Sequence, residues 1–170
     1  MQKILIAPHP ALRKQAKTLD KVTKVDVEIS KQMIQTMKNG FGAGLSANQI
    51  GILKKIITIH IQDKENNTEK LYVLFNPIIN QYSKETVIME EGCLSLPKQF
   101  AEIERPQSIQ LQYTNEKNKV IREEKNGYEA RILQHEIDHL SGKLFIDYLS
   151  SLKRNMMIKK VQKLKKMGEI

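Results

Sequence analysis

The amino-acid sequence predicts an α+β fold, with strands in the middle of the chain and helices towards both ends. Apolar residues recur at every fourth position from Val25 to Met37, which is typical of a helix with one buried face. Stretches rich in β-branched and aromatic residues lie between residues 56 and 121, and helical patterns return after Asn126. Because helices and strands are segregated along the chain, α+β is favoured over repeated βαβ units.

The first helix is predicted from its two ends. Thr23 and Asp26 have the spacing of a capping box, in which each side chain satisfies an exposed backbone N–H. The apolar stripe that follows continues to Gly40, a residue type that commonly ends helices. Pro8 and Pro10 indicate an irregular start to the chain. We expect this helix to cover a sheet.

The predicted strands share β-branched or aromatic residues, and they lie at residues 56–61, 71–75, 86–89, 109–113 and 120–121. A polar loop over residues 62–70 separates the first two, and the strand at 86–89 has the character of an edge strand. Residues 114–118 form a turn that joins the last two strands into a hairpin.

Two further helices are predicted after the strands. One begins with Asn126 as N-cap and Glu129 three residues later, and it ends near Gly142. The other runs from about Ser150 to Met167, with apolar residues on one side and a strongly basic other side.

The composition favours one domain over residues 1–170, since this length suits a single core. No apolar run approaches the roughly 18 residues of a membrane span, and the first residues lack signal-peptide or transit-peptide character. The single cysteine, Cys93, cannot form an intramolecular disulfide; by itself it is most simply a small buried hydrophobe. We therefore expect a cytoplasmic protein without a membrane partner.

The charge balance is basic, with 28 Lys and Arg against 19 Asp and Glu, or +9 at neutral pH. Such a charge attracts anionic partners, including RNA or a ribonucleoprotein surface, although solubility alone also explains it. Tryptophan is absent and aromatic residues make up 5% of the chain, with no recognisable binding motif. Sequence-specific recognition of nucleic acid is therefore not expected.

A His-Glu-x-x-His motif lies at residues 135–139 on a predicted helix. Its spacing puts His135 and His139 one turn apart on the same face, so both imidazoles can bind one metal ion. The neighbouring Glu136 can then take a proton from a metal-bound water. The alternative is a solvated helix that happens to hold two histidines. That alternative is weakened because the chain has only four histidines in all.

A site with two histidines needs a third protein ligand, which leaves one position open for water. Zinc proteases usually supply a Glu or His downstream, but residues 140–147 contain no histidine. Cys93 is the upstream candidate, because a thiolate beside a divalent metal is deprotonated and tightly held. The other two histidines, His9 and His60, lack acidic neighbours at ligand spacing and are expected to be surface or structural residues.

Three segments together resemble the signature motifs of bacterial-type peptide deformylases, in the same order and at familiar spacing. They are Gly-Ala-Gly-Leu-Ser-Ala-Asn-Gln at 42–49, Glu-Gly-Cys-Leu-Ser at 91–95 and Gln-His-Glu-Ile-Asp-His at 134–139. The similarity extends over essentially the whole chain. It implies an α+β fold in which antiparallel β-sheets pack around a central metal-binding helix, with an N-terminal and a C-terminal helix.

The resemblance implies a metal centre and a reaction. Cys93, His135 and His139 would hold one divalent metal ion, expected to be Fe²⁺, with Zn, Ni or Co as substitutes. Glu136 would act as general base and then general acid when the metal-bound water attacks the formyl carbon. The family hydrolyses the N-terminal formyl group of formyl-methionyl nascent polypeptides and releases formate. The residues themselves suit zinc at least as well as iron.

The resemblance also implies contacts with the substrate. The side chain of Gln49 and the backbone N–H of Leu94 would donate hydrogen bonds to the oxyanion of the tetrahedral intermediate. Ala43, Gly44 and Gly92 would line the substrate site, Gly44 because a side chain there would block the approach of the substrate backbone.

The chain departs from the family pattern in the pocket wall. Ala43 stands where Val or Ile is commoner, Ser46 where Ala is commoner, and Phe41 where an acidic residue is frequent. These differences bear on the side-chain preference more than on the reaction. Glu91 is further expected to pair with Arg105 and fix the loop of the second motif; the alternative is two separate solvated charges.

Two other functions stay open. A metallopeptidase would use the same His-Glu-x-x-His helix, but it would leave the motifs at 42–49 and 91–95 unexplained. A catalytically inactive binding module is the other. The basic C-terminal helix either has a solvated face or docks to the ribosome. Its charges are at Lys153, Arg154, Lys159, Lys160, Lys163, Lys165 and Lys166. The protein is expected to be a monomer.

Overall fold

The computed structural model describes residues 2–63 and 65–170. Met1 lies outside the described residues, and so does Lys64, which belongs to the predicted loop over residues 62–70. The helices are α1 (Lys24–Asn39), α2 (Gly127–Leu140) and α3 (Ser151–Lys166), with short 3-10 helices η1 (Pro10–Arg13), η2 (Ala47–Ile50) and η3 (Phe145–Tyr148). The strands are β1 (Gly44–Ser46), β2 (Ile56–Asp63), β3 (Thr68–Tyr82), β4 (Thr86–Cys93), β5 (Leu96–Pro106), β6 (Ser108–Thr114) and β7 (Val120–Asn126).

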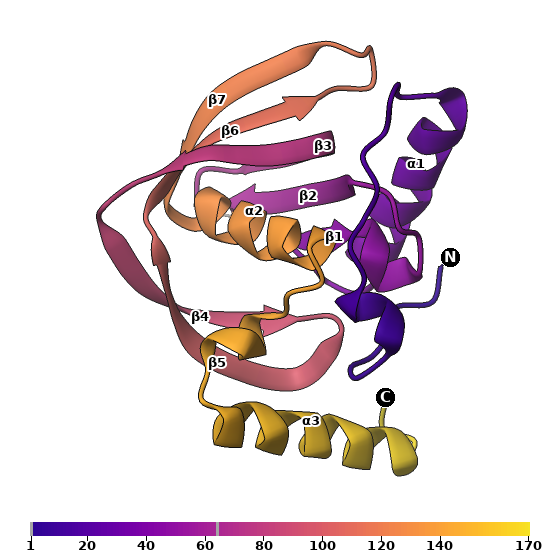
Figure 1. Ribbon diagram of the computed structural model, residues 1–170, viewed down its shortest axis with the longest axis vertical. Coiled ribbons are helices and arrows are strands. Elements are labelled where there is room, and N and C mark those ends of the chain that lie inside the picture. The colour runs from indigo at the N-terminus through magenta and orange to yellow at the C-terminus, as the bar shows by residue number, and fades with distance from the viewer. Residues whose placement is uncertain (1, 64) are drawn as a thin grey trace.

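The strands form two antiparallel sheets, and the predicted α+β fold is confirmed. In the described part of the chain, five strands pair in the order β1-β2-β3-β6-β7, and β4 pairs with β5 in a separate hairpin. Helix α2 lies between the five-stranded sheet and this hairpin (Figure 1). The metal-binding motif is therefore carried on the central helix of the molecule.

The five-stranded sheet is covered on both faces. Ile57 and Ile59 of β2 point towards α2, in a cluster with Leu133. Ile56 points the other way, into a cluster with Met37 of α1. Since alternate residues of a strand face opposite sides, burial on both faces explains the nearly continuous apolar run of β2.

Helix α1 begins with the predicted capping box. Thr23 accepts a hydrogen bond from the Asp26 backbone, and the Asp26 carboxylate accepts one from the Thr23 backbone. The predicted stripe is wrong at its first position, because Val25 is 64% exposed whereas Met33 and Met37 are fully buried. Steps of four residues advance about 40° around a helix with 3.6 residues per turn, so the stripe drifts off the buried face.

The strands are longer than the sequence predicts. Strand β3 continues to Tyr82, and β4 continues to Cys93, which brings the second motif to the end of a strand. Strand β5 was not predicted, because its two prolines and its charged residues hide the alternation of the buried side chains. The hairpin of β6 and β7 is confirmed, with Thr114 opposite Val120. The polar loop is shorter than the predicted 62–70, since β2 continues to Asp63, which pairs with Thr68 at the start of β3.

The start of α2 differs from the prediction. Asn126 occupies the N-cap position, but its side chain makes no capping hydrogen bond. Glu129 forms no capping box; its carboxylate accepts hydrogen bonds from Tyr72 and Lys70 of β3 and pairs with Lys125 of β7. These three donors come from the sheet, and they hold the carboxylate away from the helix N-terminus.

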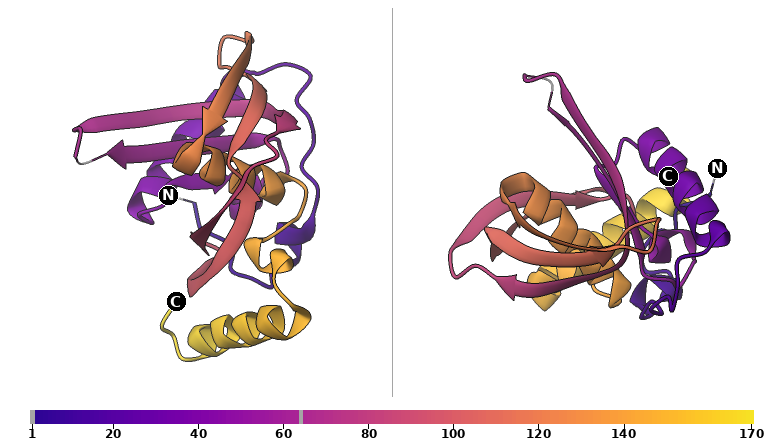
Figure 2. Two further views of the ribbon diagram at one scale, coloured as in Figure 1. Left: turned by 90° about the vertical axis from the view of Figure 1, so that its left-hand side faces the viewer. Right: turned by 90° about the horizontal axis from the view of Figure 1, so that it is seen from above.

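Helix α3 lies at the far end of the molecule along β5, apart from the five-stranded sheet (Figure 2). It begins close to the predicted Ser150, which serves as its N-cap, and Val161 is buried in a cluster with Leu96 and Phe145. The other face of α3 carries exposed lysines. Among the helices of the described residues, each is too short or too polar to cross a membrane.

Candidate metal centre

Three side chains with metal-binding atoms meet between the β4–β5 hairpin and α2. Cys93 is the last residue of β4, and His135 and His139 lie one turn apart on α2. The Sγ atom of Cys93 lies 3.3 Å from Nε2 of His139, which lies 3.2 Å from Nε2 of His135. The three ligand atoms all fall within 4.8 Å of one another.

The donor set fits a divalent metal ion. Metal bonds of about 2.0 Å to nitrogen and about 2.3 Å to sulfur give tetrahedral edges of roughly 3.3 to 3.6 Å. The separations between the nitrogens of the two histidines, 3.2 Å, and between His139 and Cys93, 3.3 Å, are close to these edges. A thiolate and two imidazoles suit zinc and ferrous iron alike.

The two imidazoles differ in proton affinity. Burial and the neighbouring His135 lower the pKa of His139 well below its ordinary value. Burial opposes the charged form of His135 as well, but its hydrogen bonds with Cys93 and Glu91 raise its pKa well above the ordinary value. Binding of a metal ion at these nitrogens therefore competes with a proton.

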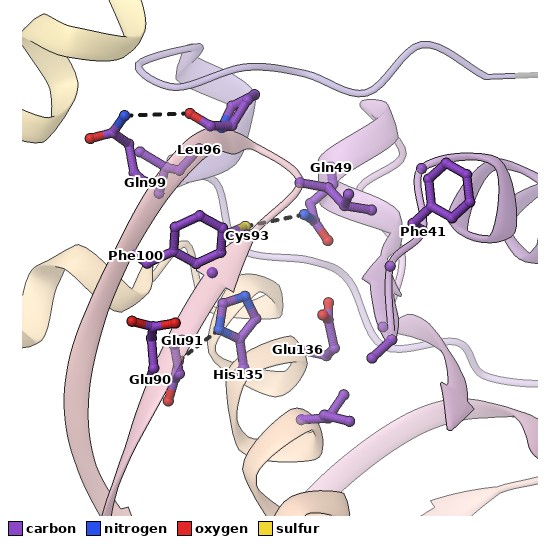
Figure 3. Close-up of a pocket in the computed structure, with 18 of the residues that line it drawn as sticks. Phe41, Gln49, Glu90, Glu91, Cys93, Leu96, Gln99, Phe100, His135 and Glu136 are labelled. Atoms are coloured by element: carbon purple, nitrogen blue, oxygen red, sulfur yellow. Dashed lines mark hydrogen bonds and ion pairs between the residues drawn. The ribbon is translucent and has the colours of Figure 1, made fainter. Parts of the chain in front are cut away.

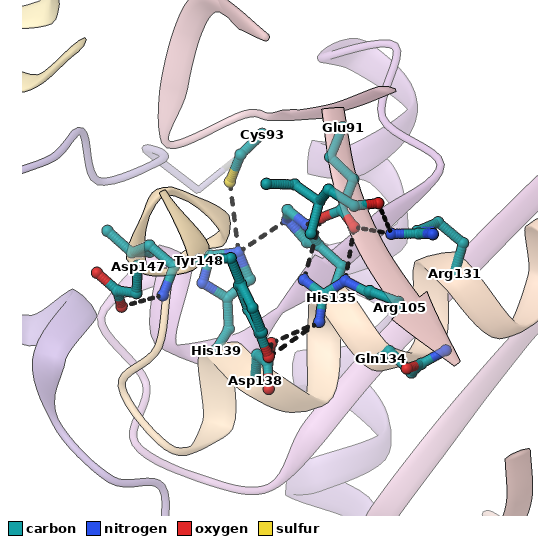
Figure 4. A network of polar contacts seen from close by, with 12 residues as sticks. Glu91, Cys93, Arg105, Arg131, Gln134, His135, Asp138, His139, Asp147 and Tyr148 are labelled. Atoms are coloured by element: carbon teal, nitrogen blue, oxygen red, sulfur yellow. Dashed lines mark hydrogen bonds and ion pairs between the residues drawn. The ribbon is translucent and has the colours of Figure 1, made fainter. Parts of the chain in front are cut away.

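A buried carboxylate orients His135. Glu91 of β4 is 5% exposed, and its Oε2 lies 2.8 Å from Nδ1 of His135, which turns Nε2 towards the other ligand atoms. Arg105 donates to both Glu91 oxygens at 2.6 and 3.1 Å, and Arg131 donates to Oε1 at 2.8 Å (Figure 4). The predicted pair of Glu91 and Arg105 is confirmed. Burial alone would raise the pKa of Glu91, but the hydrogen bonds from His135 and Arg105 hold it well below its usual range.

The same guanidinium ties the hairpin to α2 and η3. Arg105 Nη1 donates to Asp138 at 2.7 Å and to the Tyr148 hydroxyl at 3.2 Å, and Tyr148 donates to Asp138 at 2.8 Å. The Arg105 guanidinium also lies over the Tyr148 ring, 4.5 Å from its centroid. Asp138 sits between the two histidines in sequence, so the network fixes the helical turn that carries them.

Glu136 is the carboxylate beside the ligand cluster. It is 4% exposed, and among the described residues its Oε2 has no hydrogen-bond partner. Burial raises its pKa to about 7, against the opposing charge of His135. A Cβ atom on Gly44 would lie 2.6 Å from Oε1 of Glu136. Because Gly44 has no side chain, there is room for the Glu136 carboxylate. The resemblance gave another reason for glycine here, the approach of the substrate backbone.

Gln49 is held with its amide nitrogen towards the cluster. Its Nε2 lies 3.5 Å from Cys93 Sγ and 3.2 Å from Ser95 Oγ. Its Oε1 accepts hydrogen bonds from the Ser46 backbone at 2.9 Å and from the Ser46 hydroxyl at 3.2 Å. The serine at position 46 therefore anchors Gln49 through a contact between residues three apart in the chain. Ser95 lies 46 residues from Gln49, and only the fold brings it there; neither serine was predicted as a site residue.

A pocket of about 510 Å³ opens beside the cluster (Figure 3). Its lining contains the predicted catalytic and substrate-site residues Ala43, Gly44, Gln49, Gly92, Cys93, Leu94, His135 and Glu136. Leu94 lies in the turn between β4 and β5, next to Cys93. His139 is 1% exposed and is buried beneath the residues that line the pocket.

The other two histidines have structural contacts, as predicted. His9 Nδ1 accepts a hydrogen bond from the backbone of Ala11 at the start of η1. His60 Nε2 lies 2.6 Å from Glu69 Oε1 on the neighbouring strand. Arg131, which holds Glu91, was not predicted from the sequence, since an arginine inside a helical pattern carries no sign of its partner across the fold.

The sequence profile described as polypeptide deformylase matches residues 1–155 of the chain. The chain belongs to this family. A peptide deformylase from Rickettsia canadensis (strain McKiel) is 43% identical over 166 residues, 95% of each chain. Another from Agrobacterium fabrum is 41% identical over 160 residues, 94% of each chain.

Solved structures of peptide deformylases share the fold. A peptide deformylase from Ehrlichia chaffeensis superposes with a TM-score of 0.95 at 34% identity, covering 100% of this chain and 99% of that one. The structure from Ehrlichia chaffeensis in complex with actinonin gives 0.91 at 36% identity over 96% of each chain. The chain is thus a member of an enzyme family that removes formyl groups, with a Cys, His, His cluster that fits the divalent metal used by the family.

Proposed function

We propose that this chain hydrolyses the N-terminal formyl group of formyl-methionyl nascent polypeptides and releases formate. The observation that carries the proposal is the meeting of Cys93, His135 and His139 beside Glu136 and Gln49, at the wall of a pocket large enough for a peptide end. Family membership and the relatives named peptide deformylase support the same reaction. A metallopeptidase loses support because the third candidate ligand is Cys93 rather than a Glu or His. An inactive binding module loses support because the candidate ligands, Glu136 and Gln49 lie together in one site.

Cys93, His135 and His139 would hold one divalent ion, Fe²⁺ as expected from the family, with Zn, Ni or Co as possible substitutes. Such an ion, when bound, polarises the formyl oxygen and lowers the pKa of water towards about 7. Glu91 is a positioning residue in this proposal, because it fixes the ring of His135 through Nδ1.

Glu136 is proposed as general base and then general acid. Its Oε2, which has no hydrogen-bond partner in the described part of the chain, and its raised pKa support this role, because a carboxyl that titrates near neutral pH can both take and return a proton. It would accept the proton of the attacking water and pass it to the leaving amine of methionine. Gly44 contributes by leaving space for the carboxylate.

Gln49 and the backbone N–H of Leu94 are proposed to stabilise the developing oxyanion. The Gln49 Nε2 hydrogens point to Cys93 Sγ at 3.5 Å and to Ser95 Oγ at 3.2 Å, and a substrate oxygen entering the pocket can take the place of either acceptor. The hydrogen bond from the Ser46 backbone to Oε1 fixes the orientation of the Gln49 amide. Removing one such donor typically costs roughly a hundredfold or more in rate.

The peptide main chain is proposed to lie between two strand edges. Strand β1 is an end strand of its sheet, and Ala43 and Gly44 line the pocket from that side. Gly92 of β4 lines it from the other side. An extended peptide can pair with such an edge through its backbone, which binds many sequences and leaves side-chain choice to the pocket walls.

The whole chain, residues 1–170, is proposed to act as one catalytic domain, as a monomer in the cytoplasm where nascent peptides are made. The exposed lysines of α3 support docking to the ribosome, since anionic RNA attracts a basic helix. Charge reversal of Lys160, Lys163 and Lys166 tests this, with ribosome binding measured by co-sedimentation. Unchanged binding would refute docking and leave a solvated helix face.

The reaction is tested with formyl-Met-Ala-Ser under anaerobic, iron-loaded conditions, with metal analysis of the same sample. Formate release supports the proposal; cleavage of a peptide bond would support a metallopeptidase, and neither product a binding module. Glu136→Gln should abolish formate release while metal content stays intact. Glu102→Gln, on the exposed face of β5, is the matched control. Actinonin, found in complex with the Ehrlichia relative, should inhibit the wild-type enzyme.

A further inference from the structure

Helix α1 ends in a motif that normally requires glycine at the position held by Phe41. The backbone N–H of Gly42 donates to the Met37 carbonyl at 3.0 Å, and that of Phe41 donates to the Lys38 carbonyl at 3.1 Å. This is the hydrogen-bond pattern of a Schellman motif, with Gly40 as C-cap. Phe41 therefore adopts the left-handed conformation, with φ of 56°. Only glycine occupies that region without a steric cost from Cβ.

Burial of the Phe41 side chain does not offset the conformational cost of its left-handed backbone. Its side chain is 97% exposed, so it adds no packing to the core. The loop beneath it is fixed, because Leu94 fills the space beside its two glycines: a Cβ on Gly42 would lie 2.7 Å from Leu94 Cδ1, and one on Gly40 would lie 3.2 Å from Cδ2. A non-glycine residue held in this conformation at a binding site points to a role in binding.

Phe41 stands at the junction of two hollows. One is the pocket of about 510 Å³ beside the metal centre, and the other is a hollow of about 470 Å³ lined by Lys38, His60, Ile61 and Gln62. Phe41, Gly42, Ala43 and Tyr128 line both. Tyr128, from the first turn of α2, is 56% exposed. Figure 3 shows Phe41 and Phe100 on opposite sides of the first pocket.

We propose that Phe41 and Tyr128 form an aromatic rim that contacts the second and third residues of the peptide and selects apolar side chains there. This inference rests on the proposed function. A peptide whose end lies at the metal centre has to leave the pocket through its mouth, and the second hollow continues that path. At about 3.3 Å per residue, the second and third residues of an extended chain lie roughly 3 and 7 Å beyond the first, on the path out of the pocket. Exposed aromatic faces then bind apolar or aromatic side chains there in preference to small ones.

The rim is tested by comparing peptides that differ only after methionine. The substrates are formyl-Met-Ala-Ser, formyl-Met-Phe-Ser and formyl-Met-Ala-Phe, each assayed for kcat/KM by formate release. An aromatic contact changes affinity by roughly 2- to 12-fold. We expect the wild-type enzyme to favour at least one phenylalanine peptide by such a factor, with the difference in KM. Phe41→Gly should bring the ratio close to one.

The stability of the same variants separates binding from structure. Glycine and asparagine both tolerate the left-handed conformation, so Phe41→Gly and Phe41→Asn should melt at or above the wild-type temperature while losing selectivity. Phe41→Tyr should retain the selectivity. Leu152→Ala, at another exposed apolar side chain on α3, should change neither.

The outcomes are distinct for the two proposals. Formate release from every peptide with unchanged ratios in Phe41→Gly and Phe41→Asn would overturn the aromatic rim and leave the deformylase reaction standing. A wild-type enzyme without preference among the three peptides would do the same. Absence of formate from all peptides in the wild-type, metal-loaded enzyme would overturn the proposed function and the rim with it.

Discussion

Replacement of Glu91 by glutamine should destabilise the fold and weaken the metal centre together. The Glu91 carboxylate is the shared acceptor of Arg105 and Arg131, whose side chains are 3% and 4% exposed, and of the His135 ring. Removing one partner of a buried ion pair costs about 3–5 kcal/mol, because the remaining charge is buried without compensation. Arg105 keeps its second carboxylate, Asp138, so the lower end of about 3 kcal/mol is expected.

The effect on the metal follows from the same contact. Without a charged acceptor at Nδ1, His135 is held less firmly, and loss of such a partner typically lowers metal affinity roughly 10- to 100-fold. The free energy of unfolding is measured by urea denaturation of the metal-free protein, and metal affinity by competition with a chelator. Glu102→Gln, an exposed glutamate on the adjoining strand, should change stability by less than about 0.5 kcal/mol.

Two results would refute this reasoning. A loss of less than about 1 kcal/mol in Glu91→Gln would mean that the arginines are compensated elsewhere or hydrated. In a double-mutant cycle of Glu91→Gln with Arg105→Gln, additive effects on metal affinity would show that the pair does not act on the site as a unit.

The other predictions concern the oxyanion donor, the space beside the base and an acid-sensitive contact. Gln49→Leu should lower kcat roughly a hundredfold or more with metal content unchanged; full activity would remove the oxyanion role. Gly44→Ala should lower kcat more than it changes KM, since the new Cβ would meet the Glu136 carboxylate at 2.6 Å; unchanged kinetics would show that Glu136 can shift freely. Burial raises the pKa of Glu129, but hydrogen bonds from two lysines and a tyrosine outweigh it and lower the pKa to about 2. Its stabilisation is therefore present above about pH 4.5 and lost as the pH falls towards 2. Glu129→Gln should be less stable by about 1–2 kcal/mol at pH 7, and the difference should vanish near pH 2 in acid denaturation curves.

Local signals in the sequence were sufficient for the helices. The capping box at Thr23 and the glycine after α1 act within a few residues of the helix ends, and each is found where predicted. Helix α3 begins at Ser151, close to the start expected at Ser150. Prediction failed where long-range contacts compete with local ones. Glu129 has the spacing of a capping residue, yet donors from β3 and β7 take its carboxylate.

Strand ends and pairings were less predictable for a physical reason. A strand is stabilised by partners far away in sequence, so β5 carries little periodic signal of its own and is recognised only from its pairing with β4. The pair Glu91 and Arg105 was predicted, but Arg131 was not, because nothing near it in sequence marks its partner 40 residues away.

The sequence by itself determined the α+β class and the placement of His135 and His139 one turn apart, because residues at fixed helical spacing keep that spacing in any fold that forms the helix. The proposed reaction and the proposed assignment of Cys93 as the third ligand came from the resemblance of three motifs to a family. Only the tertiary structure decided how the site is held. The close approach of Gly44 and Glu136, the buried network around Glu91 and the contact of Ser95 with Gln49 join segments that are distant in sequence. The left-handed backbone of Phe41 follows from the local motif that ends α1, but its exposure beside the pocket emerges only in the tertiary structure, since a local pattern carries no record of what faces it across the fold.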